Sequence, residues 1–234
     1  MISNDIDFDP PRRQLAARTR TQIAGFLQAS AAESLRDCLQ REVPWTLAER
    51  SQGHSTTHTA TDYAAMSQAQ RQALHDAAYR QARDGFQFVY DSYMMVKAAR
   101  EGRDPRLPLH AVLEFLNGGE FLDFARWLTG VPGINAVNAQ ATRYRPGHFL
   151  TRHQDEEKNE GRVFAYVINL TPRWDTDWGG LLQFQDDAGD VLDTFAPRWN
   201  SLSIFRVPQS HSVSLVTPWA GEDRLAITGW FLKR

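Results

Sequence analysis

The stretch "YRPGHFLTRHQDEEKNEGR", residues 144–162, decides how the rest of the chain is interpreted. Its strand-like run, Phe149-Leu150-Thr151, leads directly into His153-Gln154-Asp155, and a solvated loop of acidic residues with a glycine is expected to follow. Side chains two residues apart on a β-strand point to the same face. His153 and Asp155 should therefore project together, at a spacing that suits two ligands of one metal ion.

A third ligand has to come from elsewhere in the chain. After His153 the sequence has a single further histidine, His211, which lies 58 residues later in "FRVPQSHSVSLV". A His-x-Asp pair with a distant histidine is the 2-His-1-carboxylate triad, which leaves open coordination positions on Fe(II). A structural zinc site would instead favour a closed tetrahedral set with cysteines. We therefore predict an iron site made by His153, Asp155 and His211.

The last strand-like run, "RLAITGWF" (224–231), suggests a second element of the site. Period-two alternation places four residues on one face of this run: Arg224, Ala226, Thr228 and Trp230. An arginine on an otherwise apolar face needs an anion as its partner. A cosubstrate carboxylate would satisfy Arg224, with the Thr228 hydroxyl nearby. The alternative is a structural ion pair of Arg224 with Glu222 or Asp223.

The hydrophobic period changes near residue 132. Before it, helical spacing predicts helices over residues 15–40, 67–83, 107–116 and 119–128, with short extended segments at 43–50 and 85–93. After it, short runs bounded by Gly, Pro, Asp and Asn predict strands at 136–144, 163–170, 181–185, 201–206, 212–216 and 224–232. This pattern predicts an α+β fold with a jelly-roll core, also called a double-stranded β-helix, and an N-terminal helical region packed on it. We expect a single domain over 1–234, with a mainly helical part at 1–132 and the catalytic core at 133–234.

Composition narrows the class of protein. The net charge of −2 gives no general reason to expect a nucleic acid or an anionic membrane as partner. The single cysteine, Cys38, excludes an intramolecular disulfide, which fits a reducing compartment. The N-terminal segment has no apolar signal core, and no run approaches the length of a membrane span. We expect a soluble, cytoplasmic protein.

Several blocks recur in the order of a known family. They are Tyr144, His153-Gln154-Asp155, "GRVFAYVINLTPRW" (161–174), "WGGLLQF" (178–184), "PRWNSLSIF" (197–205), His211 and "RLAITGWF" (224–231). On these residues the chain resembles the 2-oxoglutarate- and Fe(II)-dependent oxygenases of the prolyl-hydroxylase type. Within that group it looks most like the bacterial proline-hydroxylase-like proteins, which are related to the ribosomal-protein prolyl hydroxylases.

The resemblance implies an activity and a set of site residues. Fe(II) would be held by the three predicted ligands, and Arg224 would complete the catalytic set by pairing with a carboxylate of 2-oxoglutarate. The cosubstrate-binding residues implied by the family are Tyr144, Val167, Asn169, Leu182, Val213, Arg224, Thr228 and Trp230. Asn169 departs from the pattern, because many prolyl hydroxylases have a tyrosine there. The implied reaction consumes O₂ and 2-oxoglutarate, releases succinate and CO₂, and hydroxylates a prolyl residue in a protein or peptide, with ascorbate as a reductant.

Other functions remain open at this point. The same chemistry could act on a free amino acid or small metabolite, or the module could bind metal and 2-oxoglutarate without turnover, as a sensor. A zinc-dependent hydrolase could use the same three ligands, but it would give Arg224 no role.

Some polar residues have plainer interpretations. His54 and His58, in "HSTTH", are expected in a solvated loop, and His148 is expected at the rim of the site. Arg143, Arg145 and Arg152 either steer a substrate at the mouth of the site or form a solvated strand edge.

Overall fold

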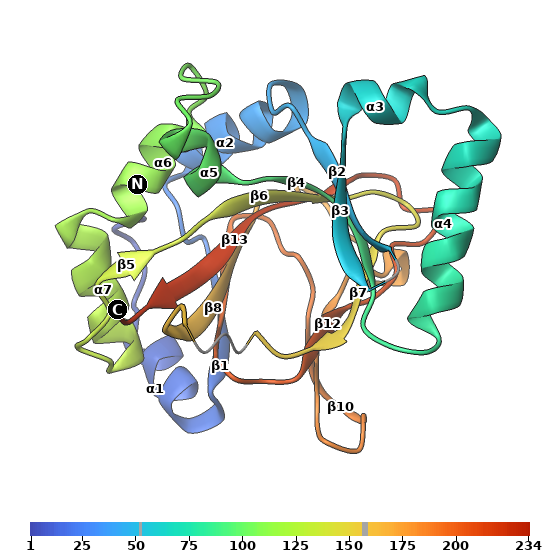
Figure 1. Ribbon diagram of the computed structural model, residues 1–234. Helices are drawn as coiled ribbons and strands as arrows, with labels where there is room; N and C mark the ends of the chain where they lie inside the picture. Colours follow the sequence, from blue (N-terminus) through green and yellow to red (C-terminus); the bar gives the residue numbers. More distant parts are fainter. Residues whose placement is uncertain (52, 156–158) are drawn as a thin grey trace.

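The computed structural model of the protein describes residues 1–51, 53–155 and 159–234 (Figure 1). Its strands are β1 (Arg20–Ala24), β2 (Thr46–Ser51), β3 (His54–Thr59), β4 (Phe88–Tyr93), β5 (Ala136–Val137), β6 (Gln140–Tyr144), β7 (Phe149–His153), β8 (Arg162–Asn169), β9 (Leu182–Gln185), β10 (Val191–Phe195), β11 (Ser201–Arg206), β12 (His211–Val213) and β13 (Arg224–Leu232). Its helices are α1 (Asp9–Arg18), α2 (Ala29–Arg41), α3 (Ala60–Ala65), α4 (Gln68–Ala82), α5 (Met95–Arg100), α6 (Leu109–Leu116), α7 (Gly119–Thr129) and the short 3₁₀ helix η1 (Thr176–Trp178). The acidic loop expected after Asp155 falls mainly on residues 156–158, outside the described residues.

The strands form one antiparallel sheet that curls into a nearly closed barrel. Its main path runs β1-β11-β8-β13-β6-β4-β7-β12-β9-β10, and β2, β3 and β5 pair beside this path. Helices α1, α2, α5, α6 and α7 gather over one side of the barrel, whereas α3 and α4 stand at the other (Figure 1). The predicted double-stranded β-helix core with helices packed on it is confirmed.

Alternation along β8 separates the helical layer from the barrel interior. Phe164, Tyr166 and Ile168 are buried in the large core that includes residues of α2, α6 and α7. Ala165 and Val167 point the other way and pack in a second cluster inside the barrel. This division follows from strand geometry, because side chains of one strand alternate between faces.

The N-terminal part contributes strands as well as helices. The predicted helix over residues 15–40 is wrong, because β1 interrupts it between α1 and α2. Thr19 (φ 62°) ends α1 in a left-handed backbone conformation, and Gly25 (φ +65°) adopts a similar conformation directly after β1. β1 instead pairs along its whole length with β11, so a distant strand overrides the local helical pattern.

The segment of His54 and His58 is also not a loop. It forms β3, a largely exposed strand that pairs with β2, and His58 lies 3.3 Å from the Glu49 carboxylate on the neighbouring strand. β2 in turn pairs with β4, which connects β6 to β7 in the main path of the sheet. One wall of the barrel is therefore built from residues N-terminal to the predicted core.

Side chains join the two ends of the sheet. The Asp193 carboxylate of β10 accepts hydrogen bonds from Arg20 Nε of β1 at 3.0 Å and from Arg18 at 3.1 Å. Gln22 of β1 donates through Nε2 to the Ala196 carbonyl at 2.9 Å. We call these contacts the seam.

Among the described residues, no helix combines the length and the apolar character that crossing a membrane requires.

Candidate metal and cosubstrate site

Two neighbouring strands bring the predicted metal ligands together. β12 pairs with β7 so that His211 lies opposite His153, and Asp155 follows two residues after the end of β7. Asp155 Oδ1 is 3.4 Å from His153 Nε2, and Oδ2 is 3.5 Å from His211 Nε2. The three donor atoms all lie within 4.8 Å of one another. The predicted triad is therefore one cluster in the folded chain.

Hydrogen bonds fix how both imidazoles face the cluster. His153 Nδ1 lies 3.0 Å from the Thr151 carbonyl oxygen, and His211 Nδ1 lies 2.8 Å from that of Gln209. A carbonyl oxygen only accepts, so Nδ1 of each ring carries a proton and Nε2 is the ring atom that faces Asp155. Burial, together with the nearby charge of His153, lowers the pKa of His211 to about 4. His211 is therefore neutral at pH 7, the form that binds a metal.

The carboxylate of the cluster is ionised. Burial opposes ionisation of Asp155, but the hydrogen bond with His153 and the neighbouring imidazoles outweigh it, so the pKa of Asp155 lies below its ordinary value. The side chains of His153, Asp155 and His211 are 15%, 11% and 6% exposed. Two imidazoles and one carboxylate, with the cavity on their free side, fit a metal ion with open coordination positions.

Arg224 faces the same cavity, which has a volume of about 440 Å³. The residue is 3% exposed, and its Nε has no hydrogen-bond partner among the described residues. Its guanidinium carbon lies 5.1 Å from the centre of the Tyr144 ring, and burial lowers the pKa of Arg224. A buried cation without an anionic partner is costly, so this position fits a ligand carboxylate.

The structural alternative for Arg224 finds no support in the ion pairs of the described residues. Glu222 lies 3.7 Å from Arg173, and Asp223 lies 3.9 Å from Arg143. Arg224 and Leu225 point to opposite faces of β13, and Arg224 is on the face of the metal cluster.

Most of the predicted cosubstrate-binding residues line this cavity: Tyr144, Val167, Leu182, Val213, Arg224, Thr228 and Trp230. Asn169 is placed differently. It is buried beside β11, where its amide nitrogen lies 3.2 Å from Ser201 Oγ and 3.3 Å from Ser203 Oγ. Asn169 is not among the residues that line the cavity.

The cavity also has a wall that the sequence reasoning missed. Phe86, Phe88 and Tyr90 line it from β4 and the turn before it, and Arg162 lines it from β8. The sequence does contain a pattern that indicates this wall. In "GFQFVYDSY" (85–93) the aromatic residues at 86, 88 and 90 alternate with period two, which places them on one face of a strand. The segment was predicted to be extended but was not connected to the site.

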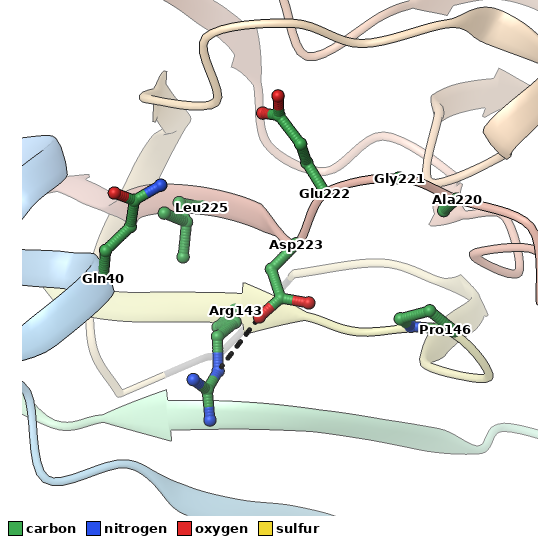
Figure 2. A pocket seen from close by; sticks show the side chains of 8 residues that line it. All are labelled: Gln40, Arg143, Pro146, Ala220, Gly221, Glu222, Asp223 and Leu225. Atoms are coloured by element: carbon green, nitrogen blue, oxygen red, sulfur yellow. Dashed lines mark ion pairs between the residues drawn. The ribbon is translucent and has the colours of Figure 1, made fainter.

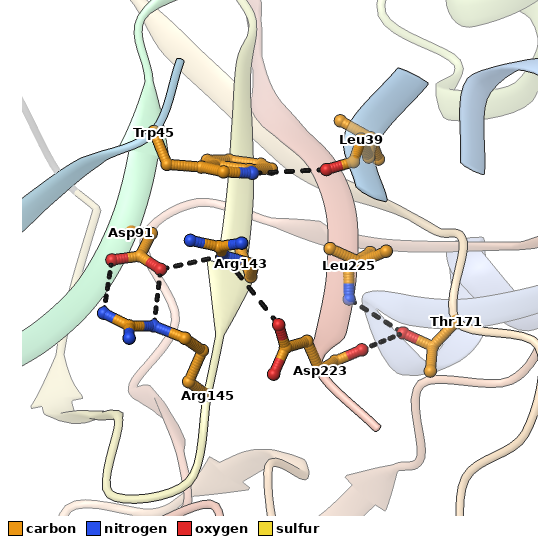
Figure 3. A network of polar contacts seen from close by, with 8 residues as sticks. All are labelled: Leu39, Trp45, Asp91, Arg143, Arg145, Thr171, Asp223 and Leu225. Carbon is orange, nitrogen blue, oxygen red and sulfur yellow. Dashed lines mark hydrogen bonds and ion pairs between the residues drawn. The ribbon is translucent and has the colours of Figure 1, made fainter. Parts of the chain in front are cut away.

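Arg143 and Arg145 do not form a free strand edge, because both are held in ion pairs, and neither is among the residues that line this cavity. Both donate through Nε to Oδ2 of the buried Asp91, each at 2.8 Å, and Arg143 stacks on Trp45 (Figure 3). Arg143 lines another cavity of about 410 Å³ together with Asp223 and Leu225 (Figure 2). Tyr144 and Arg143 are adjacent on β6, so this second cavity lies on the other face of the sheet.

His148 is not at a rim. It is 1% exposed, and its ring stacks on His75 of α4 with 6.1 Å between ring centres. Burial lowers the pKa of His148 to about 3, so the imidazole is neutral in the folded protein. The turn at Gly147, which has φ +88°, returns the chain inward at this point. Arg152, by contrast, is exposed on β7.

Comparison with known proteins shows which class of protein the chain resembles. Residues 139–232 match the family model of the 2OG-Fe(II) oxygenase superfamily, and this segment contains all three predicted metal ligands and Arg224. This match, together with the prolyl hydroxylases described next, confirms the resemblance to oxygenases of the prolyl-hydroxylase type.

Two of the relatives that match in sequence are called prolyl hydroxylases. Prolyl 3-hydroxylase OGFOD1 of Xenopus laevis is 37% identical over 121 residues, which cover 47% of this chain and 23% of the relative. The Mus musculus protein of the same name is 36% identical over 121 residues, which cover 47% of this chain and 22% of that protein. The matched segment thus spans less than a quarter of the length of these relatives.

Two solved structures share the fold. A Pseudomonas putida prolyl-4-hydroxylase superposes with a TM-score of 0.60 at 18% identity, covering 97% of this chain and all of that one. A Trichoplax adhaerens prolyl hydroxylase, in complex with a peptide fragment of the hypoxia inducible factor oxygen degradation domain, gives a TM-score of 0.61 at 17% identity. It covers 97% of this chain and 89% of that chain.

Proposed function

We propose that this protein is a 2-oxoglutarate- and Fe(II)-dependent dioxygenase that hydroxylates a prolyl residue in a protein or peptide. One observation carries the proposal: Arg224, a buried cation with an unpaired Nε among the described residues, faces the same cavity as the His153, Asp155 and His211 cluster. A metal-binding triad and a carboxylate-binding arginine in one cavity fit a ligand that binds both.

The chain's own residues have separable roles. His153, Asp155 and His211 would hold the iron, and Arg224 would bind and orient the distal carboxylate of 2-oxoglutarate, with the Thr228 hydroxyl beside it. Iron with 2-oxoglutarate and O₂ supplies the oxidant that converts a C–H bond of the substrate into an alcohol, with release of succinate and CO₂. The apolar lining, which includes Val167 and Leu182, would exclude water around the reacting groups.

The substrate class rests on the relatives. The Xenopus laevis and Mus musculus proteins are called prolyl 3-hydroxylases, and the Trichoplax adhaerens enzyme was solved with a peptide bound. We extend that substrate class to this chain and propose ascorbate as the reductant that keeps the iron in its ferrous state. A cytoplasmic location remains part of the proposal.

Anaerobic reconstitution tests the proposal. Fe(II) and 2-oxoglutarate should produce the weak visible charge-transfer band of the chelate. Admission of O₂ should then produce succinate, at a rate that proline-containing peptides increase and alanine-substituted twins do not. A folded protein without the band would contradict the cosubstrate assignment, whereas a band without peptide-dependent turnover would contradict the prolyl substrate.

A further inference from the structure

An exposed aromatic residue lies directly beside the metal cluster. Phe86 is 40% exposed, lines the cavity, and its ring centre is 5.4 Å from that of His153. It precedes β4 and belongs to the part of the chain outside the family match. A large apolar ring that remains exposed at the mouth of a binding cavity offers a surface for a partner.

Phe86 begins an aromatic stripe that leads inward. Its ring centre is 5.7 Å from that of Phe88, which is 5.5 Å from that of Tyr90. Tyr90 stacks on Tyr144 with 5.2 Å between ring centres. The stripe joins the mouth to the position proposed for 2-oxoglutarate, and only its outermost ring is substantially exposed.

Hydrogen bonds through Gln87 hold the base of this stripe. The Gln87 backbone N–H donates to Thr151 Oγ1 at 2.8 Å, and its carbonyl accepts from the Thr151 N–H at 2.9 Å. Its side-chain amide donates to the Arg50 carbonyl at 2.7 Å. Gln87 therefore ties the turn to β7, the strand that carries His153, and to β2.

Arg50 backs the exposed ring. Its guanidinium carbon lies 5.3 Å from the centre of the Phe86 ring, a cation–π contact that leaves Phe86 40% exposed. Elsewhere in the lining of the same cavity, the guanidinium carbon of Arg162 lies 3.8 Å from the centre of the Trp230 ring. Two aromatic residues of the lining, Phe86 and Trp230, therefore each have a stacked arginine.

From this arrangement we propose that Phe86 is a substrate-contacting residue that packs against the apolar ring of the target prolyl residue, with Arg50 as the residue that positions it. The proposal rests on the proposed function and specifies where its substrate binds. Proline suits the position, because its ring is compact and apolar and has little conformational freedom to lose on binding. The N-terminal part of the chain would then determine substrate binding, while the family-matched part performs the chemistry.

A matched pair of variants tests the proposal. Trp127 of α7 is also 40% exposed and also carries a stacked arginine, Arg12 at 4.8 Å, but it is not among the residues that line the cavity. The probe is the best wild-type substrate from a panel of N-acetylated, C-amidated heptapeptides with a central proline. Each peptide has a control in which alanine replaces this proline. Phe86→Ala should raise the KM for this peptide about tenfold or more, with a smaller change in kcat, because ring contact contributes to binding. Trp127→Ala should behave as wild type.

Conservative variants separate contact from folding. Phe86→Tyr keeps the ring and should restore KM to near the wild-type value, whereas Phe86→Leu should restore it only in part. Arg50→Ala should raise KM by less than Phe86→Ala. Equal peptide KM values for Phe86→Ala and Trp127→Ala would overturn the role of Phe86 and leave the proposed function intact. A wild-type protein that forms the 2-oxoglutarate chelate but does not distinguish proline from alanine peptides would overturn both.

Discussion

Asp155 is the residue on which the metal site depends most directly. It is the only carboxylate of the described cluster and lies within 3.5 Å of the Nε2 atom of each histidine. Asp155→Ala should reduce the affinity for Fe(II) or Mn(II) by more than about 100-fold, because loss of a ligand exceeds the cost of losing an outer hydrogen bond. Metal titration of the purified variant measures this, with the exposed Asp187→Ala as control. Wild-type affinity in Asp155→Ala would exclude it as a ligand.

Arg224 should affect affinity and stability in opposite directions. Arg224→Met should weaken 2-oxoglutarate binding by roughly 10- to 100-fold, because a charge-assisted hydrogen bond contributes about 1.5–3 kcal/mol. The same change removes a buried cation whose Nε lacks a partner among the described residues, so without cosubstrate the variant should be at least as stable as wild type. Thermal unfolding with and without 2-oxoglutarate checks both effects. A destabilised variant with unchanged cosubstrate affinity would indicate a structural role.

His148 should make stability depend on pH. Its pKa falls from 6.5 to about 3 on folding, because burial disfavours the charged ring. The unfolded chain therefore binds a proton that the folded chain does not, and stability is lost as the pH falls from 6.5 toward 3. His148→Gln should reduce this loss by up to about 1.4 kcal/mol per pH unit between pH 6 and pH 4. Urea unfolding across this range measures the loss, with the exposed His54→Gln as the control variant.

At the scale of elements, the turn before β9 depends on a glycine. Gly179 has φ +68°, and an added Cβ would collide with the Leu215 carbonyl oxygen. Gly102 has a similar φ of +62°, but nothing lies within 4 Å of the added atom. Gly179→Ala should cost more than about 2 kcal/mol of unfolding free energy, and Gly102→Ala about 1 kcal/mol. Chemical denaturation of both variants measures the two losses of unfolding free energy. Equal losses for Gly179→Ala and Gly102→Ala would contradict a collision with the Leu215 carbonyl oxygen.

The sequence predicted elements well where alternation was strong. β8 and β13 each place large apolar residues on one face and the cavity on the other, so period two located both the strands and Arg224. The same rule placed His153 and Asp155 together. It failed for β3, because "HSTTHT" has no apolar alternation and its strand pairing comes from β2. It also failed for β1, because the local sequence pattern predicts a helix there and the strand is stabilised by its pairing with β11.

The site was predictable only in part, for a related reason. The metal ligands and Arg224 lie on strands whose phase can be counted from the sequence. The contribution of Phe86 depends on β4 connecting β6 to β7, which is a property of sheet order. Asn169 was assigned by family position, whereas its actual neighbours are the serines of β11.

At the scale of the whole molecule, the family-matched segment does not form the complete sheet without strands from the N-terminal part. β4 connects β6 to β7, and β1 covers the edge of β11. A fragment of residues 133–234 should therefore lack a cooperative thermal transition and should not bind metal tightly, whereas the full chain should do both. Circular dichroism melting and metal titration of the fragment decide this. The single-domain prediction for residues 1–234 stays a prediction until then, and a sharp melting transition of the fragment would contradict it.

The seam has a consequence for how the protein is made. Arg20 and Asp193, which join the two ends of the sheet, are 173 positions apart in the chain. Synthesis begins at the N-terminus, so β1 is made long before β10 and β11 exist. Contacts between such distant residues form slowly, because a long loop must close first. During translation, β1 therefore remains unpaired until most of the chain has been synthesised. We expect the barrel to close in one of the last steps of folding.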